Sequence, residues 1–131
     1  MFSTKGRYAL RVIIDLAQQD SCEYIPLKDI AERQDISKKY LEIIAKEMVK
    51  GKLIIGASGK HGGYKLTRKP EEYSVGEIID LMEGTFAPVV CLECNGEECP
   101  RLNNCKTIAM WKEFYELEKE FFYNKKISDL L

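Results

Sequence analysis

Residues 26–66 read PLKDIAERQDISKKYLEIIAKEMVKGKLIIGASGKHGGYKL, and this stretch decides the fold. Pro26 favours the first turn of a short helix over residues 27–33. After a tight connection, Ser37 is a good N-cap for a longer helix over residues 38–50, because its hydroxyl accepts a hydrogen bond from an otherwise unpaired backbone N–H.

The longer helix leads into a hairpin. Its inner stripe has apolar residues at 3-4 spacing, and Gly51 fits the left-handed position that ends such a helix. These apolar residues are Leu41, Ile44, Ala45 and Met48. Two short strands, 53–55 and 64–66, flank the glycine-rich turn 59–63. A short helix, a tight turn, a capped helix and a two-stranded hairpin follow in the order of a winged helix-turn-helix.

The flanking sequence is mainly helical. A broad apolar face predicts a helix over residues 4–19. A capping-box pattern at 74–77 opens another helix, which Gly84 closes. The last helix, 107–123, is rich in large apolar side chains, and their spacing predicts two adjoining stripes: Met110, Phe114, Leu117 and Phe121 on one, and Ile108, Trp111, Tyr115 and Phe122 on the other. We therefore expect a mainly α fold: a winged helix-turn-helix with a two-stranded wing and a long C-terminal dimerisation helix.

The length and composition fit one small globular protein. The chain has 131 residues, of which 45% are hydrophobic and 31% are charged, and this is too apolar for a disordered chain. We predict a DNA-binding domain over 1–84, a cysteine-rich loop over 85–106 and a dimerisation helix with a tail over 107–131. Apolar runs are too short for a membrane span and no signal peptide is apparent, so we expect a cytoplasmic protein without a membrane partner.

Charge is distributed unevenly along the chain. Residues 1–70 carry a net charge of +6 and residues 71–131 a net charge of −7, while residues 38–69 hold 9 basic against 2 acidic side chains. Such asymmetry indicates a basic face that meets an anion, although chance clustering of surface charge remains an alternative.

The basic segment contains the side chains that we expect at a DNA duplex. A recognition helix presents polar groups to base edges and phosphates near its N-terminus. The candidates there are Ser37, Lys38, Lys39, Tyr40 and Glu42. In the wing, Lys60 lies at the tip and glycines such as Gly62 permit close approach. Each piece taken alone is also compatible with a solvated helix face or an ordinary turn.

Four of the five cysteines form a cluster, Cys91-x2-Cys94-x4-Cys99-x5-Cys105, and Cys22 stands alone. In a cytosolic protein such a cluster favours metal ligands over disulfides. Zinc sites usually show two separated C-x2-C pairs, so the uneven spacing favours an iron–sulfur cluster. A zinc site and a thiol redox switch remain alternatives.

Four motifs resemble one known family. They are STKGRYAL at 3–10, SKKYLE at 37–42, GGYKL at 62–66 and SVGEII at 74–79. Together they resemble the bacterial winged-helix transcriptional regulator family of IscR, NsrR and CymR, along essentially the whole chain. The resemblance implies a homodimeric transcription factor, such as a repressor, that binds an operator duplex, pairs its C-terminal helices and carries its sensor in the cysteine loop.

The resemblance is incomplete at the expected cofactor. Ile108 stands where IscR-like members have a histidine ligand, and Arg7 stands where NsrR-like members have an aspartate. Ser58 aligns with the wing arginine of IscR-like members, so Lys60 is the alternative minor-groove contact. The spare cysteine then completes a set of four thiolates, able to hold a 2Fe–2S or a 4Fe–4S cluster. These thiolates are Cys91, Cys94, Cys99 and Cys105.

Other functions fit the sequence less well. A CymR-like regulator would sense by thiol chemistry or through a partner protein. A small electron-transfer protein would leave the basic segment unexplained. An enzyme with a small-molecule substrate is not expected, because the chain has one histidine, no phosphate-binding loop and no dinucleotide fingerprint.

Overall fold

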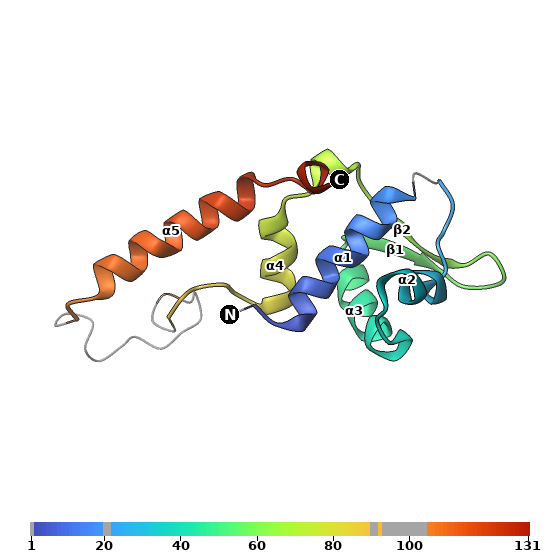
Figure 1. Cartoon of the computed structure of the whole chain (residues 1–131), viewed down its shortest axis with the longest axis horizontal. Coiled ribbons are helices and arrows are strands. Elements are labelled where there is room, and N and C mark those ends of the chain that lie inside the picture. The colour runs from blue at the N-terminus through green and yellow to red at the C-terminus, as the bar shows by residue number, and fades with distance from the viewer. Residues whose placement is uncertain (1, 20–21, 90–91, 93–104) are drawn as a thin grey trace.

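Helices dominate the chain, and one antiparallel hairpin accompanies them (Figure 1). The computed structural model describes residues 2–19, 22–89, 92 and 105–131. The helices are α1 (Thr4–Gln18), α2 (Leu27–Gln34), α3 (Lys38–Lys50), α4 (Val75–Glu83) and α5 (Ile108–Asn124), the strands are β1 (Ile54–Ala57) and β2 (Gly63–Leu66), and two short 3-10 helices are η1 (Pro70–Glu72) and η4 (Ile127–Leu130). The predicted mainly helical winged-helix fold is confirmed.

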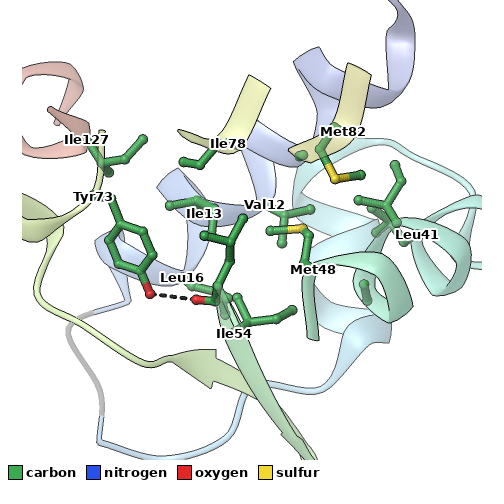
Figure 2. Close-up of a cluster of buried hydrophobic side chains, with 14 of the residues drawn as sticks. Val12, Ile13, Leu16, Leu41, Met48, Ile54, Tyr73, Ile78, Met82 and Ile127 are labelled. Atoms are coloured by element: carbon green, nitrogen blue, oxygen red, sulfur yellow. Dashed lines mark hydrogen bonds between the residues drawn. The ribbon is translucent and has the colours of Figure 1, made fainter. Parts of the chain in front are cut away.

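The head of the molecule consists of α1 to α4 and the hairpin, and α5 extends away from it (Figure 1). The inward faces of α1, α3 and α4 meet in one apolar core (Figure 2). Side chains at its centre include Val12, Ile13, Leu41, Ile44, Met48 and Ile78, all at most 1% exposed. The apolar stripe predicted for residues 38–50 is therefore the side of α3 that packs on the core.

Side-chain caps begin three of the helices. The Ser37 hydroxyl accepts from the backbone N–H of Tyr40 at 3.1 Å, which confirms the cap predicted for α3. Ser74 and Glu77 form the predicted capping box at α4. Ser3 caps α1 in the same way, a cap that the sequence pattern did not single out. The starts of these helices are thus set locally, by residues within four positions of each other.

The prediction that Gly51 ends α3 in a left-handed conformation is wrong. Gly51 has φ −82° and ψ 3°, and the positive φ, 62°, belongs to Lys52. Gly51 instead lies against the Leu81 side chain of α4, which would have to shift to make room for a Cβ at this position. The glycine therefore permits close packing between the end of α3 and α4.

The hairpin is longer at its tip than predicted. The register pairs Ile54 with Leu66 and Ala57 with Gly63, so β1 continues past the expected end at residue 55. Ile25, which precedes α2, also exchanges two backbone hydrogen bonds of 2.8 Å with Tyr64 on the free edge of β2. This bridge ties the base of the wing to the start of the helix-turn-helix.

The C-terminal residues return to the head. Ile127 of η4 is fully buried, and its N–H donates to the Tyr73 carbonyl at 3.1 Å. Tyr73 is itself buried, and its hydroxyl donates to the Leu53 carbonyl at 2.6 Å (Figure 2). One end of α5 is thus anchored to the core. None of the helices in the described part of the chain is long and apolar enough to cross a bilayer.

Candidate nucleic-acid interface

The exposed face of α3 carries most of the predicted DNA contacts. Lys38, Lys39 and Glu42 are exposed, on the side of the helix away from the core. Ser37 is exposed too, but its hydroxyl is already engaged as the cap of α3. Tyr40 is half-buried, and its ring packs edge-on against Tyr8 of α1 with centroids 5.8 Å apart. The structure therefore leaves the two lysines and Glu42 free to face a ligand and uses Tyr40 largely for packing.

A groove runs between α3 and the wing. It is lined by Lys38, Glu42 and Lys46 of α3, by Lys28 of α2, and by residues 56–59 and 62–64 of the wing. Lys28 and Lys46 were not among the predicted contacts. Spacing could have found Lys46, because it lies four residues after Glu42 and therefore on the same helix face. Lys28 required the tertiary structure.

The wing tip is exposed and polar. Ser58 and Lys60 are both exposed, as is His61, and they lie at the turn between β1 and β2. At Gly62, a Cβ would collide with the Ala57 carbonyl of the same hairpin. The glycine is therefore required by the turn itself. This requirement is independent of any ligand.

Buried polar contacts hold the helix-turn-helix on α1. The Asp15 carboxylate is 1% exposed and accepts two hydrogen bonds from Arg33, at 2.8 and 3.1 Å, and a third from Gln34 at 2.9 Å. Arg11 donates to both the side-chain and the backbone oxygen of Gln34. The hydrogen bond to Asp15 raises the pKa of Arg33, outweighing the opposite effect of burial. This network fixes the turn in front of α3.

The apolar side chains of α5 form two stripes, as their spacing predicts. On the inner stripe, Tyr115 and Phe122 pack edge-on against Phe86, with ring centroids 5.9 and 5.6 Å apart. The outer stripe is 47–60% exposed and comprises Met110, Phe114, Leu117 and Phe121. Part of it lines a groove together with Phe2. A large apolar surface of this kind is unusual on a free monomer.

Of the predicted cysteine ligands, the structure describes Cys105. Its side chain is half-buried, three residues before α5, and its sulfur lies 3.4 Å from the Thr107 hydroxyl. Cys91, Cys94 and Cys99 lie outside the described residues. Among the residues that are described, no three His, Cys, Asp or Glu side chains gather as metal ligands.

Comparison with known proteins identifies the family. A sequence model of Rrf2, described as an iron-dependent transcriptional regulator, matches residues 2–131. This chain belongs to the Rrf2 family. The Rrf2 protein of Nitratidesulfovibrio vulgaris is 40% identical to it over 111 residues, which cover 85% of this chain and 73% of that protein. The regulator IscR of Aliivibrio salmonicida is 32% identical over 130 residues, covering 98% and 76% respectively.

A solved structure extends the likeness to the fold. CymR, the global cysteine regulator of B. subtilis, superposes with a TM-score of 0.78 at 32% identity and covers 99% of this chain and 95% of its own. The Rrf2-family chain is thus a DNA-binding transcriptional regulator. Its relatives are regulators rather than enzymes, as expected from the sequence.

Proposed function

We propose that this Rrf2-family regulator works as a cytoplasmic homodimer, inserts α3 into the major groove of an operator and sets the wing against the neighbouring backbone or minor groove. The observation that carries this proposal is the lysine-rich groove between α3 and the wing. Lys28, Lys38 and Lys46 come from two helices and converge on it. Three cations in one concave surface favour a polyanion such as DNA.

The DNA interface is tested by single lysine substitutions. Lys38→Ala and Lys39→Ala should weaken binding to all duplexes alike, and each should reduce the slope of log affinity against log salt by about 0.9 for every phosphate that the missing lysine neutralised. Lys112→Ala, at an exposed position on α5, is the matched control. The affinities are measured by titration of a duplex selected from a random pool. Equal salt slopes for the wild-type protein and all three variants would contradict the placement of α3.

We further propose that Cys91, Cys94, Cys99 and Cys105 hold an iron–sulfur cluster. Cys105 fits this role, because it lies just before the N-terminus of α5, where the helix dipole favours a thiolate, and because the Thr107 hydroxyl lies within hydrogen-bond reach of its sulfur. The family description as iron-dependent regulators also supports the proposal. When bound, such a cluster would supply a redox-active group whose loss, oxidation or nitrosylation changes the charge of the cysteine-rich loop.

Residues just before and at the start of the cysteine-rich loop 85–106 connect it to the head and to α5. Before the loop, the Glu83 carboxylate at the end of α4 accepts from the N–H and hydroxyl of Ser3, at 2.9 and 2.7 Å. Phe86 then packs against the inner stripe of α5. A change in the cysteine-rich loop would therefore reach the start of α1 through Glu83 and the packing of α5 through Phe86. This is the route by which we expect it to alter DNA affinity.

The cluster is tested on four single Cys→Ala variants purified without oxygen. Iron and sulfide content should fall to near zero for Cys99→Ala and Cys105→Ala and should fall also for the Cys91 and Cys94 variants. Cys22→Ala is the control, because Cys22 is exposed in the connection between α1 and α2. Full iron retention in the Cys99 and Cys105 variants would refute the ligand assignment, and equal DNA affinity with and without iron would refute the switch.

A second candidate is regulation by thiol chemistry or a partner protein, which the likeness to CymR favours. In that case the anaerobically purified protein would contain no iron. Its DNA affinity would then respond to a thiol oxidant, and the response would disappear in one of the Cys→Ala variants. The same set of proteins therefore separates the two candidates.

A further inference from the structure

The outward ridge of α3 has one apolar member. We define this ridge as Lys39, Ile43, Lys46 and Lys50, which are spaced four, three and four residues apart and are all exposed. Ile43 is 51% exposed, although isoleucine is among the residues most often buried. Helical periodicity places it on the side opposite the core residues Leu41 and Met48.

Ile43 is excluded from both flanks of α3. On one flank, Lys38, Glu42 and Val49 line the groove to the wing, and Lys46 of the ridge also borders this groove. On the other flank, α1 covers the helix, through the ring contact of Tyr8 with Tyr40 and the 2.6 Å ion pair of Lys5 with Glu47. Ile43 belongs to neither flank, so it lies on the outward ridge between them.

The surroundings of Ile43 favour a nucleic acid over an apolar protein surface. Its neighbours along the ridge are three lysines, which attract phosphates and would disfavour a dry protein interface. The major groove of DNA offers one apolar feature among its hydrogen-bonding groups, the 5-methyl group of thymine. A branched aliphatic side chain has no hydrogen-bonding group and so discriminates by contact with this methyl.

We propose that Ile43 determines specificity by packing against a thymine methyl group in each half-site. The proposal rests on the proposed placement of α3 in the major groove. It adds an apolar readout to the charged contacts: the lysines bind all sequences, whereas Ile43 selects those with thymine at one position. No other side chain of the outward ridge can make such a contact, because the rest are cations.

The test replaces thymine by deoxyuridine, which removes only the methyl group. A duplex selected by the wild-type protein from a random pool is substituted one thymine at a time, and binding is titrated. At one thymine per half-site, the wild-type protein should lose affinity by about fourfold, the value expected for one buried methyl group. The variant Ile43→Ala should bind the thymine and deoxyuridine duplexes equally at that position.

Two controls keep the result specific. Leu130→Ala truncates another exposed apolar residue, in η4 and outside the proposed DNA interface, and should retain the deoxyuridine sensitivity of the wild-type protein. Ile43→Val keeps a branched side chain and should retain part of the deoxyuridine sensitivity. Because Ile43 is exposed, thermal unfolding midpoints of these variants should stay close to that of the wild-type protein.

The outcomes separate this inference from the proposed function. If the wild-type protein binds every deoxyuridine duplex as tightly as the parent, Ile43 reads no methyl group, even though DNA binding stands. The same conclusion follows if Ile43→Ala keeps the full sensitivity. If no duplex is selected above background at low salt, the proposed function fails and this inference fails with it.

Discussion

At the scale of single residues, the Asp15 carboxylate is a buried charge in the head and depends on its hydrogen-bonding partners. It is paired with Arg33, which reaches solvent with 38% of its side chain exposed. The substitution Arg33→Met would leave the carboxylate with only the hydrogen bond from Gln34. We expect it to lower the free energy of unfolding by roughly 2 kcal/mol, because a buried charge loses its partner.

The measurement is the urea unfolding midpoint at unchanged slope. The double variant Asp15→Leu Arg33→Met removes both charges and should recover most of the lost stability, so the two effects will not add. If the double variant is as unstable as the sum of the single variants, the pair is not the origin of the loss.

At the scale of an element, the start of α4 predicts a pH dependence. Burial raises the pKa of Glu77, but hydrogen bonds from Arg68 and Ser74 outweigh burial and leave this pKa below its usual value. The folded state therefore favours the ionised carboxylate. Its contribution to stability, about 1 kcal/mol, is complete above the unfolded pKa of about 4.3. This contribution is lost as the pH falls through the lower, folded pKa.

Thermal unfolding between pH 3 and 7 checks this prediction. The variant Glu77→Gln should show a weaker acid destabilisation than the wild-type protein. The control Glu71→Gln alters an exposed carboxylate on η1 and should keep the wild-type pH profile. Identical profiles for the Glu77 variant and the wild-type protein would show that the capping box does not titrate in this way.

The contact between α4 and α5 depends on a glycine. A Cβ at Gly76 would lie 2.5 Å from the ring of Tyr123, and that ring cannot easily move because its hydroxyl donates to Asp80. We expect Gly76→Ala to destabilise the protein by about 2 kcal/mol through overpacking. In a Tyr123→Ala background the same substitution should have little effect. Urea unfolding of the four proteins measures this coupling.

At the scale of the whole molecule, the outer stripe of α5 predicts a twofold dimer. This stripe is exposed along the length of a helix that extends away from the head (Figure 1). Phe114→Glu places a charge in its middle and should convert a micromolar dimer into a monomer without unfolding the head, which α5 contacts through its other face. Sedimentation velocity measures the change. Lys112→Glu, two residues away at an exposed polar position, should remain dimeric, and a dimeric Phe114→Glu variant would refute this interface.

The sequence alone predicted the five α-helices, the two strands and their order, because their signals are local, whereas the short 3-10 helices η1 and η4 were not predicted. Ser37 and the pair Ser74 and Glu77 mark helix starts through contacts spanning three residues. Apolar periodicity assigned the inner face of α3 and the two stripes of α5 in the same way. The strand ends were less certain, since the ladder between Ala57 and Gly63 depends on the partner strand.

Tertiary structure decided which faces meet and which stay exposed. Asp15 and Arg33 are 18 residues apart, and no periodicity links them. Sequence suggested a left-handed Gly51, but the approach of Leu81 from α4 gives this glycine a packing role instead. Tyr40 is a candidate DNA contact by sequence, and its packing against Tyr8 of α1 is a contact that no local pattern indicated. Only the packing of α1 and the wing on either side of α3 isolates Ile43 on the outward ridge. The physical reason is common to all four: local propensity acts over a few residues, whereas burial depends on what the rest of the chain brings close.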